Sequence, residues 1–116
     1  MNIRNTLIDA LTSLGYEVRL QGSYADGEPL PESFITYYIV DAPDASFYDD
    51  KPMLTHHRIQ IVFYSKLISK INSVPDQIYS LLKTAGFIRE GKGRDYGFEN
   101  EYYGILVNYM FTERNE

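Results

Sequence analysis

The first stretch of the chain has the apolar spacing of an amphipathic helix. Ile3, Leu7, Leu11 and Leu14 recur every three or four positions and therefore share one helical face. Gly15 follows, and glycine readily takes the left-handed conformation in which helices end. We predict a helix that begins at Ile3 and ends at Gly15.

Four later ranges have the patterns of β-strands. Residues 16–20 alternate between apolar and polar side chains, as in a strand with one buried face. Residues 34–40 (FITYYIV) are aromatic and β-branched throughout, which is typical of a central strand covered on both sides. Residues 53–64 form the longest candidate, and residues 102–111 form the last one.

A second helix is predicted to open at Pro75, because proline suits the first helical position and Ser73 can cap it. Residues 67–71 would form a short turn of helix before it. Gly86 would end this helix as Gly15 ends the first. The apolar residues that share one face are Ile78, Leu81, Leu82 and Ala85.

Three polar segments are predicted to be loops. Residues 22–33 contain closely spaced glycines and prolines, and residues 41–52 carry four aspartates. Residues 89–97 are rich in glycine and charge, which predicts a mobile tip between a strand at Phe87 and the last strand. We expect residues 22–33, 41–52 and 89–100, rather than the sheet, to carry the function and to be mobile in the free protein.

Together these patterns predict an α+β fold in the order α-β-β-β-α-β-β. The sheet would be mostly antiparallel, with four or five strands and two helices packed on one face. A chain of 116 residues suits a single domain, here residues 1–116.

Composition excludes several kinds of site. The chain has no cysteine, so it has no disulfide, no thiolate metal site and no cysteine nucleophile. Its net charge of −5 disfavours sequence-independent binding of nucleic acid. No apolar run approaches a membrane span, and the first residues do not resemble a signal peptide. We expect no membrane association.

The sequence predicts no catalytic residue, metal site or cofactor, and we do not expect an enzyme. His56 and His57 are adjacent on a predicted strand, so their rings point to opposite faces, His57 beneath the helices and His56 outward. The aspartates of residues 41–52 lack the spacing of a calcium loop. The Gly91-Lys92-Gly93 segment lacks the remainder of a phosphate-binding loop.

Tyrosine is unusually frequent, with eleven in the chain. A sheet with helices on one side cannot bury all of those in or beside strands, and tyrosine is favoured at protein interfaces. The alternative is that tyrosine simply favours strands. The tyrosines concerned are Tyr37, Tyr38, Tyr64, Tyr102, Tyr103 and Tyr109.

Most of the chain, roughly residues 30–111, resembles small structural proteins of tailed phages. The group that we name is the tail-terminator and tail-to-head joining proteins of long-tailed phages and prophages. The resemblance is carried by PLPESFITYYIV (29–40), DAPDASFYDDKP (41–52), RIQIVFYS (58–65), VPDQI (74–78), LLKTAGF (81–87) and Gly91-Lys92-Gly93.

This resemblance implies a subunit that assembles as a hexameric ring at the end of the tail tube. The ring would stop tube polymerisation and join the tail to the head. Its partners would be other copies of itself, the major tail-tube protein and the head connector proteins, with transient contact with passing DNA. The implied location is the tail of the virion, assembled in the cytoplasm of a host bacterium.

A ring needs heterologous contacts, in which one surface meets a different surface on its neighbour. The acidic residues 41–52 and the basic residues Arg89, Lys92 and Arg94 are natural opposite partners. The candidate interface residues are Tyr37, Tyr38, Asp49, Asp50, Arg58, Tyr64, Arg89, Lys92 and Arg94.

Two other functions remain open from the sequence. One is a small adaptor that binds a host protein through a tyrosine-rich face containing Tyr37 and Tyr38. The other is a phage-encoded hydrolase or nuclease, which would need clustered carboxylates or a histidine–carboxylate pair in a pocket.

Overall fold

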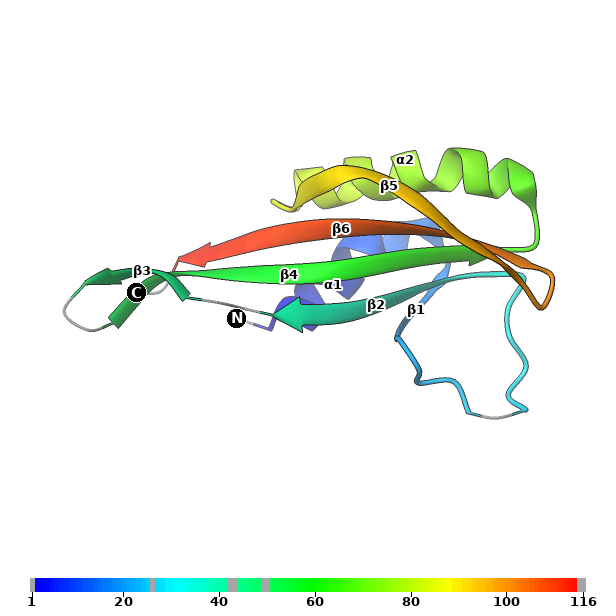
Figure 1. Cartoon of the computed structure of the whole chain (residues 1–116), viewed down its shortest axis with the longest axis horizontal. Helices are drawn as coiled ribbons and strands as arrows, with labels where there is room; N and C mark the ends of the chain where they lie inside the picture. The colour runs from blue at the N-terminus through cyan, green and yellow to red at the C-terminus, as the bar shows by residue number, and fades with distance from the viewer. Residues whose placement is uncertain (1, 26, 42–43, 49–50, 115–116) are drawn as a thin grey trace.

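The computed structural model describes the backbone of residues 2–25, 27–41, 44–48 and 51–114, and their side chains except those of residues 41–53 (Figure 1). Its elements are α1 (Ile3–Leu11), a 3-10 turn η1 (Thr12–Leu14), β1 (Glu17–Leu20), β2 (Ser33–Asp41), β3 (Asp44–Tyr48), β4 (Lys51–Ser65), α2 (Ile68–Thr84), β5 (Ile88–Glu99) and β6 (Tyr102–Arg114).

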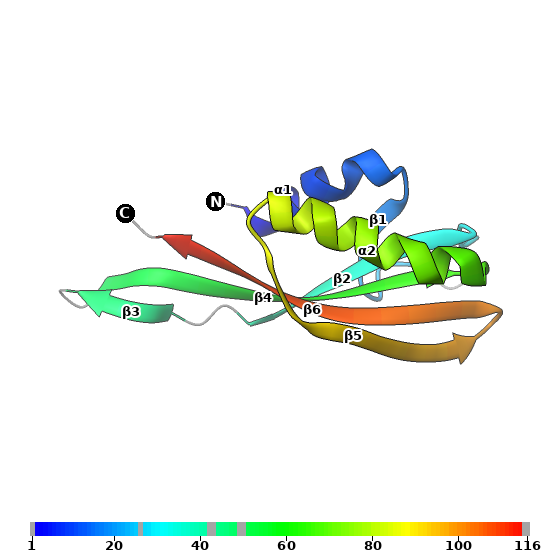
Figure 2. The same cartoon turned by 90° about the horizontal axis from the view of Figure 1, so that it is seen from above.

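The fold is the predicted α+β arrangement, with both helices on one face of the sheet (Figure 2). Five strands lie side by side in the order β1-β2-β4-β6-β5, and β3 pairs with one end of β4. Among the described strand pairs, only β1–β2 is parallel. The long central strands β4 and β6 therefore support the helices on one side and leave the other side of the sheet without helices.

The first helix begins and ends as its sequence predicts. The Asn2 side chain caps it by accepting hydrogen bonds from the backbone amides of Arg4 and Asn5. The last turn tightens into η1, and Gly15 then takes a left-handed φ of 80°.

The second helix differs from the prediction, because it is continuous through Pro75. Residues 67–71 form no separate turn, and Ser73 does not cap a helix start. Instead, the Ser73 hydroxyl donates a hydrogen bond to the carbonyl one turn earlier within α2. The helix begins early because Ile71 and Val74 are buried on its inner face, and their burial offsets the backbone hydrogen bond that proline cannot make.

The described residues within 41–52 are in strands and not in the predicted loop, whereas residues 42–43 and 49–50 lie outside the described residues. The structure forms β3 there and begins β4 at Lys51, so the two strands make an antiparallel hairpin. Pairing between backbone groups requires no alternation of apolar and polar residues. The strands could therefore not be recognised from this polar sequence. Figures 1 and 2 show this hairpin extending beyond the helix-covered part of a molecule 52 Å long. Its paired residues, 44–48 and 51–55, are called the hairpin arm below.

Residues 89–97 also form a strand rather than a tip. They belong to β5, which pairs with β6, and the tip lies further on at Asn100 and Glu101. The pairing shifts register at residues 91–93 and again at residue 96. Gly91, Gly93 and Gly97 have positive φ, and these conformations let the strand bulge and continue.

Strand β2 is covered on both faces only in its first half. It lies between β1 and β4, as expected for a central strand. Phe34 to Tyr37 are buried, whereas Tyr38 and Val40 are exposed. The helices and loops therefore cover the start of this strand and leave its end open on one face.

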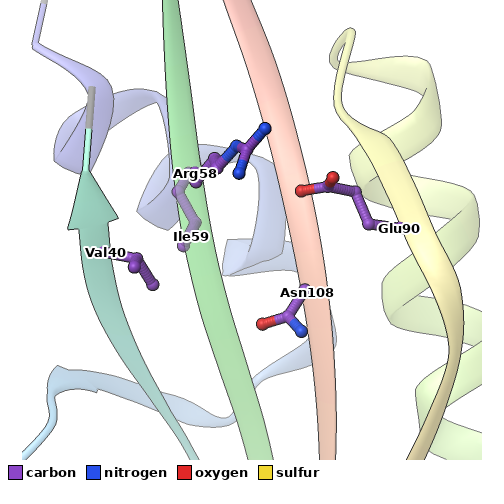
Figure 3. A pocket seen from close by; sticks show the side chains of 5 residues that line it. All are labelled: Val40, Arg58, Ile59, Glu90 and Asn108. Atoms are coloured by element: carbon purple, nitrogen blue, oxygen red, sulfur yellow. The ribbon is translucent and has the colours of Figure 1, made fainter. Parts of the chain in front are cut away.

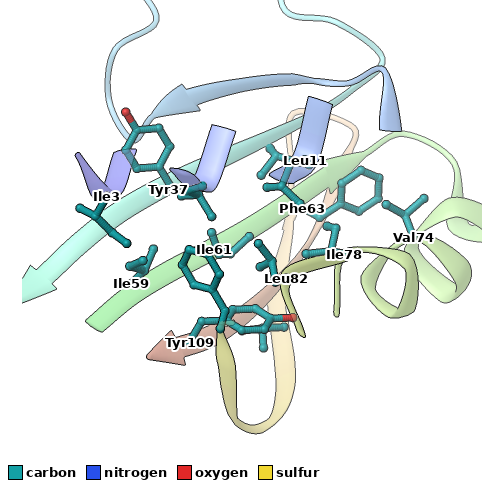
Figure 4. Close-up of a cluster of buried hydrophobic side chains, with 14 of the residues drawn as sticks. Ile3, Leu11, Tyr37, Ile59, Ile61, Phe63, Val74, Ile78, Leu82 and Tyr109 are labelled. Carbon is teal, nitrogen blue, oxygen red and sulfur yellow. The ribbon is translucent and has the colours of Figure 1, made fainter. Parts of the chain in front are cut away.

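The hydrophobic core lies between the helices and the sheet (Figure 4). The predicted alternation of β4 is confirmed, because Ile59, Ile61 and Phe63 all face the helices and are buried. Their partners in the core come from both helices and from β2 and β6. They are Ile3, Leu7, Leu11, Ile35, Tyr37, Ile71, Val74, Ile78, Leu82, Phe87, Val107 and Tyr109.

Candidate functional site

The two histidines lie on opposite sides of β4, as predicted. The His56 Nδ1 atom lies 2.8 Å from the Thr112 hydroxyl, and the His57 Nε2 atom lies 2.8 Å from a carboxylate oxygen of Glu113. This hydrogen bond from His57 holds the pKa of the Glu113 carboxyl below its ordinary value. Within the described residues, no group of three or more His, Cys, Asp or Glu side chains is placed to hold a metal ion.

The face of the sheet opposite the helices, called the open face, has two different halves. One row across it runs Tyr38, Gln60, Asn108 and Glu90, from β2 to β5. At one end of the face, beside the turn of β5 and β6, aromatic side chains and a loop cover the strands. The other half, toward the hairpin arm, is exposed.

The covered half is an aromatic cluster centred on Phe34. The ring of Tyr64 stacks on Phe34 with 4.9 Å between centroids, and the rings of Tyr24 and Tyr102 meet it edge-on. Burial in this cluster raises the pKa of Tyr64 above its ordinary value. Tyr64 was predicted as an interface residue, but its ring packs largely against other side chains of the same chain.

Residues 21–25 and 27–32 close this cluster. The Tyr102 hydroxyl donates a hydrogen bond to the Pro31 carbonyl at 2.6 Å. Arg19 donates to the Glu28 carboxylate and lies over the Tyr24 ring. The Ala25 amide and then Arg19 lower the pKa of Glu28 by hydrogen bonding to its charged form. This predicted functional loop is thus tied to the body of the protein at several points.

The predicted Tyr37/Tyr38 surface does not exist as a pair. Tyr37 is 6% exposed and belongs to the core beneath the helices, whereas Tyr38 is 49% exposed on the open face. Adjacent residues of a strand point to opposite faces, so one tyrosine had to be turned inward. Tyr38 alone remains on an accessible surface.

The three predicted basic residues are also divided. Arg89 pairs with Tyr109 in the sheet register and faces the helices, where its guanidinium lies 4.0 Å from the centre of the Tyr79 ring. Lys92 lies within the bulge and Arg94 directly after it, and both line a hollow on the open face. Arg89 therefore does not belong to the cationic strip that the sequence suggested.

The exposed half of the open face is hollowed. Figure 3 shows Arg58 from β4 and Glu90 from β5 pointing toward one another across β6, with Asn108 beside them and Val40 on the β2 side. This hollow has a volume of about 250 Å³. A second hollow of about 270 Å³ adjoins it, because Glu90 and Asn108 line both.

We call the two hollows together the open-face groove. The first is lined by Val40, Arg58, Ile59, Glu90 and Asn108, and the second by Glu90, Gly91, Lys92, Gly93, Arg94, Leu106 and Asn108. Three of the predicted interface residues, Arg58, Lys92 and Arg94, meet here. Asp49 and Asp50, also predicted, lie outside the described residues.

Sequence reasoning missed Val40, Glu90 and Asn108. Asn108 carried a usable signal, since it is the one polar residue within the apolar run of residues 105–111. Glu90 lay in a segment interpreted as a loop. The side of the sheet to which its side chain points could therefore not be inferred. Once β5 is recognised as a strand, its register places Glu90 directly opposite Asn108.

No model of a known protein family matches the chain, and a search of curated proteins finds no match. No helix within the described residues is long and apolar enough to cross a membrane. The candidate site therefore stands on its own geometry.

Proposed function

We propose that this chain is a structural subunit of phage or prophage tail assembly, which forms a ring that terminates the tail tube and joins it to the head connector. The resemblance of roughly residues 30–111 to tail-terminator and joining proteins suggested this function. The observation that supports it most is the presence of two unlike surfaces on one subunit, the hairpin arm and the open-face groove.

Two unlike surfaces suit a ring better than a closed pair. A two-fold dimer uses the same patch on both subunits, whereas a ring is built from one patch that meets a different patch on the next subunit. The arm extends from one end of the molecule, and the groove lies on the face of the sheet (Figures 1 and 3). Each subunit of a ring would use both surfaces.

The arm also offers backbone groups for an intermolecular contact. Strand β3 pairs with β4 along one of its edges, and no other strand of the described chain pairs with it. An unpaired strand edge carries free amide and carbonyl groups that favour pairing with another chain. A neighbouring subunit or the tail tube would satisfy them.

The adaptor alternative is weakened in the form that the sequence suggested. It relied on Tyr37 and Tyr38 forming one binding face, and Tyr37 is part of the core. The hydrolase alternative finds a histidine–carboxylate pair in His57 and Glu113. That pair does not line the open-face groove.

The test is tail-tube termination in vitro. Tubes assembled from the major tail-tube protein encoded near this chain would be incubated with the purified chain and viewed by electron microscopy. We expect a ring at one end of each tube and an arrest of tube growth. Tubes that continue to lengthen and carry no ring would overturn the proposal.

The genomic neighbourhood gives an independent check. We expect genes for head connector proteins and for a major tail-tube protein beside the gene for this chain. If neither is encoded nearby in any genome that carries the gene, the tail assignment falls.

A further inference from the structure

We propose that two copies of this chain pair antiparallel through residues 94–99 of β5, about a two-fold axis. These residues are called the free edge below. The inference goes beyond the proposed function, because it concerns the chain before it joins a ring. Figures 1 and 2 show the free edge near the turn of β5 and β6, at the opposite end of the molecule from the hairpin arm. The pair therefore leaves the arm accessible.

Strand β5 is the last strand on one side of the sheet. Its partner among the described strands is β6, and Figure 2 shows β5 as the outermost strand on its side. Every residue from Glu90 to Glu99 is exposed. A strand edge of this kind presents amide and carbonyl groups that favour pairing with a further strand.

The free edge also carries exposed aromatic side chains. Phe98 is 60% exposed, more than any other large apolar residue that the structure describes, and Tyr96 is 49% exposed. Phe98 contacts Tyr103, and together with Ile68 at the start of α2 it lines a hollow of about 350 Å³. Charged residues alone would protect an edge strand from pairing, whereas exposed aromatic surface favours being covered.

The charges at the two ends of the free edge select a second copy as the partner. Arg94 begins the free edge and Glu99 ends it. Antiparallel pairing therefore sets Arg94 of one copy opposite Glu99 of the other, and the two-fold axis repeats this contact. Within the described residues, neither side chain makes an ion pair in its own copy. Opposite charges that face each other across two strands stabilise their pairing.

The faces of the sheet agree with this register. Arg94 lies opposite Leu106, which lines the open-face groove. Glu99 lies opposite Tyr102, which belongs to the aromatic cluster on the same face. Arg94 and Glu99 thus share the open face, as two residues that meet across neighbouring strands must.

The residues between them fit the same register. Tyr96 lies opposite Gly97 of the second copy, beside the two-fold axis, where the absence of a side chain leaves room for the ring. Asp95 lies opposite Phe98, and their partners in β6 place both on the helix side of the sheet. A slip by one residue would bring side chains of opposite faces together. Charge and facing therefore select one pairing.

The other edge of the sheet is the rival partner. Strand β1 ends the sheet there, and contact of β5 with β1 would extend the sheet from copy to copy. Strand β1 has only four residues, however. Its Arg19 already binds Glu28, and the Leu20 carbonyl accepts a hydrogen bond from the Ser23 amide. A second β5 offers the longer and less occupied edge.

Disulfide trapping tests the register, because the natural chain has no cysteine. Arg94→Cys and Glu99→Cys would be prepared as separate variants and mixed. In a mixed pair the two cysteines lie opposite each other, and the second contact keeps its native arginine and glutamate. We expect the mixture to form disulfide-linked dimers about tenfold faster than either variant alone. In a pair of identical variants, the two cysteines lie at opposite ends of the free edge and are too far apart to join.

Two further mixtures serve as controls. Arg94→Cys mixed with Glu17→Cys probes the edge of β1, and Arg94→Cys mixed with Ser13→Cys probes an exposed site on η1. Preferential trapping with Glu17→Cys would assign the contact to β1 and overturn the two-fold pair. Trapping of Arg94→Cys alone at the rate of the mixture, or no trapping in any mixture, would also overturn it.

Charge reversal tests the proposed cause in the chain without cysteine. Arg94→Glu alone and Glu99→Arg alone should each weaken the dimer about tenfold in sedimentation equilibrium, because both contacts of the pair become repulsive. The double variant exchanges the charges and should restore the dimer. Arg4→Glu, at an exposed position of α1, is the matched control and should change little. A natural chain that sediments only as a monomer, or a double variant as weak as the single ones, would overturn the inference.

The outcomes separate this inference from the proposed function. Tube termination by a chain that is always a monomer before assembly would leave the tail function standing and remove this pair. A dimer with the predicted trapping, formed by a chain that does not terminate tubes, would establish the pair and remove the tail function.

Discussion

Among the glycines, Gly93 is the one at which the structure leaves least room for a side chain. Its φ is +84°, and a Cβ atom there would lie 2.6 Å from Val107 Cγ2 and 3.1 Å from the Leu106 carbonyl oxygen. Gly91 has a similar φ of +87° with nothing within 4 Å. Comparing alanine substitutions at Gly91 and Gly93 therefore separates the energetic cost of the backbone conformation from the cost of a steric clash.

We predict that Gly93→Ala lowers the free energy of unfolding by about 2–4 kcal/mol, because strain and overpacking add. Gly91→Ala should lower it by only about 1–2 kcal/mol, through strain alone. Urea unfolding of both variants measures the difference. Equal losses would show that the bulge relaxes around the new methyl group.

Tyr109 links stability to alkaline pH. Burial raises its pKa to about 12 from an ordinary value of 10.0, although nearby Arg89 opposes this rise. Between these two values the unfolded chain loses a proton that the folded chain keeps. The stabilisation is therefore complete below pH 10 and is lost as the pH rises toward 12.

We predict that Tyr109 alone lowers the free energy of unfolding by up to about 1.4 kcal/mol per pH unit between these values. Tyr109→Phe should reduce this slope. Tyr24 and Tyr64, whose pKa values are also raised by burial, would leave a smaller slope in the variant. Chemical unfolding at a series of pH values tests this, and an unchanged slope in the variant would contradict it.

At the scale of elements, the β5–β6 turn is held in a strained conformation. Glu99 pairs with Tyr102, so Asn100 and Glu101 form a two-residue turn, with φ values of 52° and 71°. Both positive values are required by a type I′ turn, which favours the sequence Asn-Gly. Glu101 also makes an ion pair with Lys66, but at 3.6 Å and high exposure this pair contributes little.

We predict that Glu101→Gly raises the free energy of unfolding by about 1 kcal/mol, because glycine adopts positive φ without the steric cost of a Cβ atom. Glu101→Gln is the matched control, since it removes the charge and keeps the side chain. It should change stability by less than about 0.5 kcal/mol. A gain of equal size in the control would assign the effect to charge rather than to backbone conformation.

The elements that the sequence predicted well are those with a buried face. The spacing of Ile3, Leu7 and Leu11 fixed α1, and the alternation of Ile59 and Ile61 fixed β4, because burial imposes the period on the residues. These patterns, with the glycine stops, were sufficient for the fold class.

Two of the errors lie where burial does not govern the backbone, and a third lies where burial overrides a local preference. The arm at residues 44–48 and strand β5 are held by pairing with a neighbouring strand, and that pairing leaves no period in an exposed sequence. Pro75 was interpreted as a helix start because local preference favours that position. Buried residues before it carried the helix through, and only the tertiary structure shows this.

At the scale of the whole molecule, the sequence predicted some of the residues of the candidate site, but it did not predict the face of the sheet to which each side chain points. Arg58, Lys92 and Arg94 were proposed as interface residues from charge, and the structure brings them to one groove. Arg89 and Tyr37 were proposed with them but face the helices. The face of the sheet to which a side chain points depends on strand register and bulges. A single sequence does not specify either of these for an exposed strand.

The hairpin arm provides the last prediction, since it separates folding from assembly. Ser46 and Leu54 are paired across the arm, so residues 47–53 can be replaced by an Asn-Gly turn that joins the two strands directly. The arm extends beyond the helix-covered part of the sheet (Figures 1 and 2), whereas the described core is drawn from α1, β2, β4, α2 and β6 and their neighbours.

We therefore expect the shortened chain to unfold within about 1 kcal/mol of the full chain in urea. It should nevertheless fail to terminate tail tubes, because each subunit of the proposed ring would have lost the unpaired strand edge of its arm. Replacing residues 47–53 by a polar segment of the same length controls for the arm's length. A shortened chain that still terminates tubes would show that the subunits meet through other surfaces, and a large loss of stability would show that the arm is part of the folding unit.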